Sequence, residues 1–140
     1  MARLYQTLAE AHTGHSAAAR LWRKTAREEE NHAAQFSLII DAIPETVVKA
    51  SIDVRSLESL RSAVEATTEE FHRNLPSIRD ALVATLHFEE TMDRIHAHKA
   101  LVFTEPRVQR MFGAMMAADR GHVSELRAAL QRHGRTEKGR

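Results

Sequence analysis

Two pairs of side chains that could bind a metal lie at matched positions in the two halves of the sequence. Glu29 and His32 are three residues apart, and so are Asp119 and His122. Residues three apart share a face of an α-helix, so each pair would present a carboxylate beside an imidazole. Apolar residues with helical spacing surround both pairs, and burying an unpaired charge among them is costly. The pairs therefore indicate either a metal site or a buried hydrogen-bonded network.

The two pairs belong to an internal repeat. Asp119 follows Glu29, and His122 follows His32, by the same interval of 90 residues. Apolar residues repeat with that interval too: Trp22 matches Phe112, Phe36 matches Leu126 and Ile40 matches Leu130. The chain is therefore predicted to consist of two helical hairpins joined by a long crossover.

The spacing of apolar residues, with turn residues between the apolar runs, predicts an all-α protein. Pro44 to Ser56 has β-branched residues and no helical period, so we expect an extended connection there, with Ser56 capping the next helix. No β-hairpin and no glycine-rich phosphate loop is expected. The expected helices cover roughly residues 1–12, 17–42, 57–72, 78–103 and 107–130.

Two hairpins with a helix-containing crossover form a four-helix bundle, a fold that often holds a dinuclear metal site. Two of its helices each give one carboxylate, and the other two each give a Glu-x-x-His pair. In the third bundle helix the apolar stripe directs Glu89 inward, while Glu90 points about 100° away. Carboxylates and imidazoles suit iron or manganese. The candidate metal ligands are Glu29, His32, Glu89, Asp119 and His122.

For other polar residues near these positions, the sequence supports less specific predictions. Glu28 and Glu30 are expected to be solvated, and Glu90 and Asp93 to lie at the surface or just outside the site. Tyr5 is either a core residue with a satisfied hydroxyl or a hydrogen-bond donor to a ligand. No residue is assigned a catalytic role.

From about Leu4 to Leu130 the chain resembles the ferritin-like superfamily, and within it the rubrerythrin-like proteins. The matching motifs are L-Y-x-x-L-A-E, L-W-x-x-x-A-x-E-E-E-x-H-A, and A-L-V-A-T-L-H-F-E-E followed by D-x-x-H-x-x-x-L. The resemblance implies a ferritin-like antiparallel four-helix bundle with a dinuclear iron, or sometimes manganese, centre. It also implies oxidoreductase chemistry with O2 or H2O2, of the ferroxidase or peroxidase type. The alternative is a non-catalytic metal-binding, iron-storage or interaction bundle with an incomplete metal site.

The sequence departs from that pattern at two places. Asp119 stands where the family more often has Glu, and its side chain is one methylene shorter. The repeat puts the carboxylate of the first helix ahead of Met1, while Glu10 lies roughly three turns from the expected height. Three explanations stay open: the native chain starts upstream, a second chain donates the ligand, or five ligands hold one metal or none.

Composition limits the remaining possibilities. The 140 residues are expected to form one ferritin-like bundle over residues 1–132, with a polar tail at 133–140. A net charge of +1 with interleaved acids and bases argues against a nucleic-acid partner. No apolar run is long enough to span a membrane, and no secretory signal is visible. Metal ions and O2 or H2O2 are the expected partners.

The absence of cysteine has further consequences. It excludes disulfides, thiolate metal sites and an attached rubredoxin-type module, and it fits a cytoplasmic protein. Electrons for a redox reaction would then come from a partner or from Fe(II) itself. The short first helix should leave apolar surface uncovered, so a homodimer or higher homo-oligomer is expected.

Overall fold

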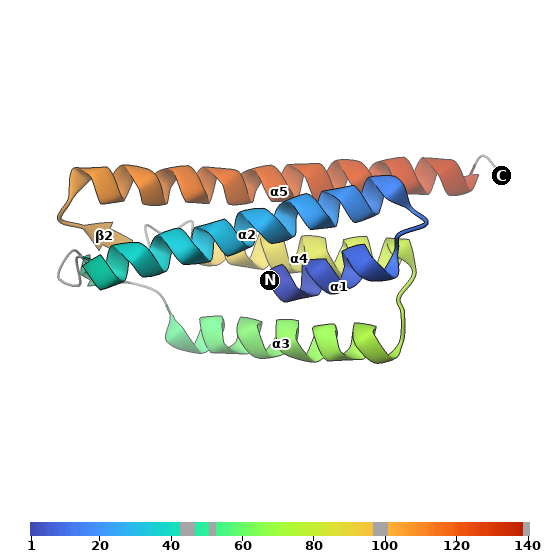
Figure 1. Ribbon diagram of the computed structural model, residues 1–140, viewed down its shortest axis with the longest axis horizontal. Helices are drawn as coiled ribbons and strands as arrows, with labels where there is room; N and C mark the ends of the chain where they lie inside the picture. The colour runs from blue at the N-terminus through green and yellow to red at the C-terminus, as the bar shows by residue number, and fades with distance from the viewer. Residues whose placement is uncertain (43–46, 51–52, 97–100, 139–140) are drawn as a thin grey trace.

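The fold consists of two helical hairpins with a helix between them (Figure 1). α1 packs against α2, α4 packs against α5, and the hairpins meet where α2 contacts α5. The crossover helix α3 contacts α1 and α4, which confirms the predicted all-α, ferritin-like architecture. The computed structural model describes residues 1–42, 47–50, 53–96 and 101–138. The helices are α1 (Ala2–Ala11), α2 (Ser16–Ala42), α3 (Val54–Arg73), α4 (Ile78–His96) and α5 (Pro106–Lys138).

Apolar residues at helical spacing form the main core. Leu4 and Leu8 on α1 are fully buried, and so is Trp22 on α2, whose ring lies 5.5 Å from the ring of His12. Fully burying one large apolar side chain contributes about 1.5–3 kcal/mol, so these contacts fix the register of the helices. The same cluster includes Tyr5, Ala26, Leu60, Val64, Ile78, Ala81, Leu82, Phe88 and Leu126.

A smaller cluster lies at the other end of α2 and α5. It contains Ile39, Phe103, Val108 and Phe112. Ile39 is buried there, whereas Ile40, the residue predicted from the repeat, is only partly buried. Neighbouring helical residues point about 100° apart, so the repeat identified the turn of α2 that reaches this cluster but not the residue on it that is buried.

Two short strands correct the sequence prediction. β1 (Val47–Ala50) pairs in antiparallel fashion with β2 (Leu101–Phe103), although no paired strands were expected. The helix predicted to reach Phe103 ends at His96 instead. Strand pairing satisfies backbone groups of the two segments, and a three-residue apolar run does not reveal its period in the sequence. Val47 pairs with Phe103, Lys49 with Val102 and Ala50 with Leu101, with an irregularity between Val47 and Lys49.

Two helix ends also differ from expectation. α3 starts at Val54 because Asp53, rather than Ser56, accepts a hydrogen bond from the Arg55 N–H at 3.1 Å. α5 continues to Lys138, so much of the tail expected from residue 133 is helical. The division into one domain and a tail stays a prediction.

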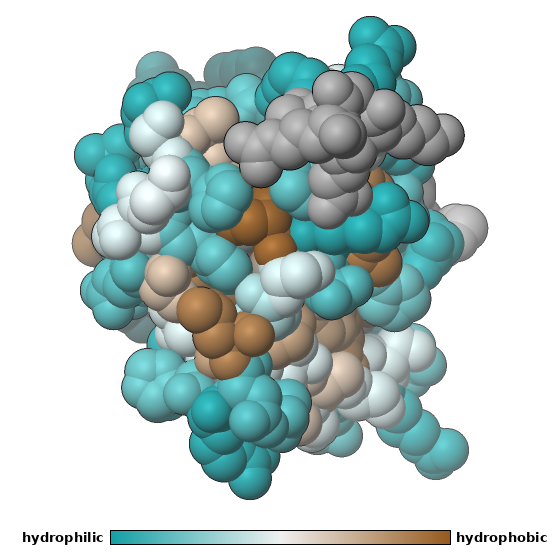
Figure 2. All heavy atoms as spheres, turned by 90° about the vertical axis from the view of Figure 1, so that its right-hand side faces the viewer, coloured by the Kyte–Doolittle hydropathy of each residue, from teal (hydrophilic) through white to brown (hydrophobic). Residues whose placement is uncertain are grey.

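Exposed apolar side chains are scattered over the molecule. Figure 2 views the end that carries the α1–α2 turn and the α3–α4 connection, where apolar patches lie between hydrophilic side chains. Leu75 in the α3–α4 connection and Met111 on α5 are exposed. Isolated exposed apolar residues are usual on folded proteins, so they identify no partner. Within the described residues, no helix combines the length and apolar character needed to cross a membrane.

The main core gives a direct test of packing. Leu82→Ala should lower the free energy of unfolding by about 2–5 kcal/mol, because it removes a buried side chain and leaves a cavity. Leu38, which is 69% exposed, provides the control, and Leu38→Ala should change stability by about 0.5 kcal/mol or less. Urea unfolding followed by circular dichroism measures both, and equal losses would contradict the packing described here.

Candidate metal centre

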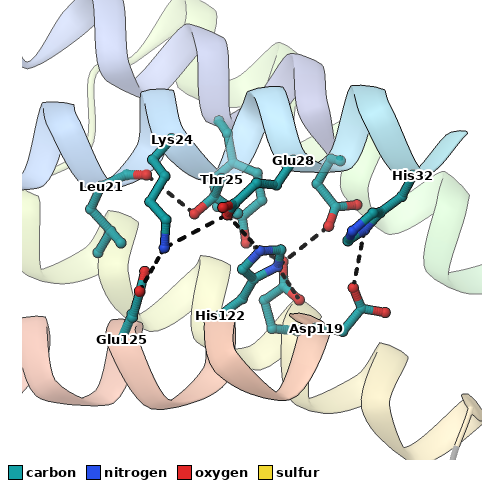
Figure 3. A network of polar contacts seen from close by, with 11 residues as sticks. Leu21, Lys24, Thr25, Glu28, His32, Asp119, His122 and Glu125 are labelled. Atoms are coloured by element: carbon teal, nitrogen blue, oxygen red, sulfur yellow. Dashed lines mark hydrogen bonds and ion pairs between the residues drawn. The ribbon is translucent and has the colours of Figure 1, made fainter. Parts of the chain in front are cut away.

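A polar cluster lies within the apolar core where α2, α4 and α5 meet (Figure 3). We name it the carboxylate–histidine cluster; it contains Glu28, Glu29 and His32 from α2, Glu89 from α4, and Asp119 and His122 from α5. All five residues proposed as ligands from the sequence lie in it. Glu89 and His122 are each only 2% exposed, and Asp119 only 7%.

Helix geometry explains how these side chains meet. On α5, Leu126 is fully buried one turn after His122, so the face that packs into the core also carries the imidazole. On α4, Glu89 points inward, while its neighbour Glu90 accepts hydrogen bonds from Arg127 Nε and Nη2 at 3.1 and 2.7 Å. The predicted orientation of this helix is therefore correct.

His122 is the centre of the cluster. Its Nδ1 lies 3.4 Å from Glu29 Oε1 and 3.8 Å from Glu89 Oε2. Its Nε2 lies 3.0 Å from Glu28 Oε2. Nδ1 is buried and has no hydrogen-bond partner among the described residues, although carboxylate oxygens face it. An unpaired imidazole nitrogen that faces carboxylates has the arrangement of a metal ligand.

His32 and Asp119 form the adjoining part of the cluster. His32 Nδ1 lies 3.4 Å from Asp119 Oδ1, and the His32 and His122 rings stack with centroids 6.3 Å apart. Ligand atoms of Glu29, Asp119 and His122 all lie within 4.8 Å of one another. Ligands of one ion are about 4 Å apart or closer when metal–ligand distances are about 2 Å, so small side-chain rotations would bring the three onto one ion.

The charges in the cluster favour a cation. Glu28, Glu29, Glu89 and Asp119 surround the two imidazoles, and buried like charges repel strongly. Burial alone lowers the pKa of His122, but the carboxylates of Glu29, Glu89 and Glu28 outweigh burial and raise this pKa to about 10. A protonated His122 thus provides positive charge in the metal-free protein. The donor set fits a divalent iron or manganese ion, which would replace that proton.

Tyr5 orients Glu89. The buried Tyr5 hydroxyl donates a hydrogen bond to Glu89 Oε1 at 2.5 Å, which leaves Oε2 on the side of His122. Burial, together with the negative charge of Glu89, raises the pKa of Tyr5 well above its ordinary value. Tyr5 therefore remains a neutral donor at physiological pH. Of the two possibilities left open by the sequence, the structure shows the hydrogen bond to a candidate ligand.

Glu28 corrects the sequence analysis. It was expected to be solvated, yet its Oε2 lies within hydrogen-bond distance of His122 Nε2 and 3.8 Å from Lys24 Nζ. Lys24 in turn donates to Glu125 Oε1 at 2.6 Å, and this hydrogen bond is the main cause of the raised pKa of Lys24. Glu28 precedes His32 by four residues, so a same-face argument could have found it.

The pKa of His122 predicts how pH affects stability. In the folded, metal-free protein this pKa rises from 6.5 to about 10, so the folded state binds the proton more tightly. The resulting stabilisation is complete below about pH 6.5 and is lost as pH approaches about 10. Urea unfolding of chelator-treated protein across this range should show a steeper loss for wild type than for His122→Gln. Equal pH slopes would contradict the assignment.

The Tyr5–Glu89 hydrogen bond gives a second test. Tyr5→Phe should lower the free energy of unfolding by about 1.5–3 kcal/mol, because the buried Glu89 carboxylate loses its donor. A double-mutant cycle with Glu89→Gln isolates the pairwise interaction. A coupling energy near zero would show that the two side chains do not interact in solution.

Comparison with known proteins agrees with this geometry. A protein-family model described as Rubrerythrin matches residues 2–130, which is nearly the whole chain. No curated protein and no solved structure gives a match. The carboxylate–histidine cluster lies within the matched region. The chain therefore belongs to the rubrerythrin family, whose members are ferritin-like diiron proteins.

Proposed function

We propose that the carboxylate–histidine cluster binds a dinuclear iron or manganese centre and that the protein is an oxidoreductase acting on O2 or H2O2. Glu29, Glu89 and Asp119 would bridge or chelate the metals, while His32 and His122 would each bind one. The observation that carries the proposal is the buried Nδ1 of His122, which has no hydrogen-bond partner among the described residues and faces Glu29 and Glu89. A redox-active metal at this place would supply electron transfer to O2 or peroxide, as in a ferroxidase or peroxidase.

The residues around the cluster suit this role. Tyr5 holds Glu89 in one orientation, and Glu28 holds His122 by its other nitrogen. Apolar neighbours such as Leu126 and Ala26 limit the access of water. Because the sequence has no cysteine, electrons would come from Fe(II) or from an external donor. A homodimer or higher oligomer is proposed as well, on the basis of the short α1.

A second candidate is a non-catalytic metal-binding, iron-storage or interaction bundle. One specific observation favours it: among the described residues, no ion pair or hydrogen bond gives His32 a carboxylate equivalent to Glu89. The two candidates differ in turnover rather than in fold or metal binding.

Metal analysis tests the first proposal. At saturating Fe(II) or Mn(II), wild type should bind about two ions per chain, because the fold provides two His positions. The double variant Glu29→Ala, His122→Ala should lose them, and Glu30→Ala, an exposed residue on the same helix, should not. Binding is measured by elemental analysis after desalting, and folding by circular dichroism.

Turnover separates the two candidates. Loaded protein should oxidise excess Fe(II) with O2 or H2O2 faster than the double variant does. Metal binding without turnover would support the storage or interaction bundle. A wild type that binds no metal, and that still folds after both substitutions, would contradict a metal centre of either kind.

A further inference from the structure

The two halves of the carboxylate–histidine cluster share one pair of equivalent contacts. Glu29 on α2 lies 3.4 Å from His122 on α5, and Asp119 on α5 lies 3.4 Å from His32 on α2. The 90-residue repeat relates these two contacts to each other, because Glu29 corresponds to Asp119 and His32 corresponds to His122. The repeat is therefore a valid guide to which residue in one half corresponds to which residue in the other.

Glu28 breaks this equivalence. Its carboxylate lies 3.0 Å from His122 Nε2 and 3.8 Å from Lys24 Nζ, which in turn donates a hydrogen bond to Glu125 on α5 (Figure 3). In a histidine that binds a metal, a carboxylate near the ring nitrogen that faces away from the metal fixes the ring. It also makes the nitrogen that faces the metal more basic. The residue that corresponds to Glu28 is Ala118, whose methyl group cannot accept a hydrogen bond from His32. A carboxylate thus contacts the Nε2 nitrogen of His122, and no described residue contacts His32 in the same way.

Two further differences act in the same direction. Glu89 lies 3.8 Å from His122 Nδ1, whereas within the described residues the polar partner of His32 is Asp119. The His122 side chain is 3% exposed and that of His32 is 19% exposed. The His122 half therefore has more ligands and less contact with solvent, both of which slow the loss of an ion.

We propose that the cluster has two unequal metal positions: a tight, slowly exchanging one at His122 with Glu29, Glu89 and Asp119, and a weaker, exchangeable one at His32. The inference rests on the proposed metal centre, but it concerns affinity and exchange rather than the reaction. The ion at His122 is then a resident ion. The ion at His32 enters and leaves from the more exposed side.

Titration of the metal-free chain with Mn2+ tests this inequality, with unbound Mn2+ measured by electron paramagnetic resonance. Wild type should bind in two steps whose dissociation constants differ at least about tenfold, the effect that an outer carboxylate has on a histidine ligand. Anomalous scattering from crystals grown with one equivalent of Mn2+ should show the ion at His122. Binding of one ion only, even at saturating Mn2+, would overturn the weaker position at His32.

Two variants with matched controls identify the cause. Glu28→Gln should weaken the tight step by about 10–100-fold and leave the weak step unchanged. Glu30→Gln, the same change at an exposed position of α2, should alter neither step. Ala118→Glu should strengthen the weak step, because it gives His32 the carboxylate that His122 already has. Ala117→Glu, at an exposed neighbouring position, should not.

The outcomes separate this inference from the proposed function. Three outcomes would overturn the inequality while leaving a metal centre in place. The first is two binding steps of equal affinity, and the second is a first ion bound at His32. The third is a Glu28→Gln variant that weakens neither step, or weakens both steps alike. A wild type that binds no Mn2+ and no Fe(II) would overturn both.

Discussion

The structure depends on how one bundle buries several carboxylates around two imidazoles. Transferring an unpaired carboxylate from water into an apolar interior is very costly, so such groups persist only with compensating charge or hydrogen bonds. In the metal-free protein the compensation comes from a protonated His122, the Tyr5 hydroxyl and Lys24 at the edge. A divalent ion provides more positive charge at the same place. The geometry that accommodates the carboxylates without metal is therefore also suited to the proposed metal centre.

This constraint determines what the apolar core must do. Leu4, Leu8, Trp22 and Leu126 contribute no chemistry, but their burial fixes the rotation of α1, α2 and α5. A rotation of one residue, about 100°, would exchange Glu89 for Glu90 at the centre and leave a buried carboxylate without Tyr5. Packing and polar contacts thus select the same orientation of each helix, as expected for a sequence that specifies one fold.

The sequence predicted the parts of the molecule that follow from periodicity. Helical spacing placed α1, α2 and α5, and the repeat then paired Glu29 and His32 with Asp119 and His122. The β1–β2 pair was missed because each strand is too short to show a period and its partner is distant in sequence. Glu28 lies one turn before His32, so its position on that face of α2 could have been inferred, but its partner, the His122 ring of α5, could not. Contacts between the two hairpins depend on how the hairpins pack together, which the sequence pattern of a single helix does not reveal.

The repeat also explains why a symmetrical backbone can carry an asymmetrical site. The two hairpins place Glu29 and Asp119 at equal distances from the histidine of the other hairpin, so the framework itself favours neither half. The difference comes from side chains on one side only: Glu28, which corresponds to Ala118 in the repeat, and Glu89, which lies near His122. Glu28 contacts His122 on α5 and lies near Lys24, which donates a hydrogen bond to Glu125 on α5, so the support of His122 is part of the interface between the hairpins. In such a duplicated fold, replacing a single side chain should change one proposed metal position without disturbing the other, because the shared core fixes the helices independently of either imidazole.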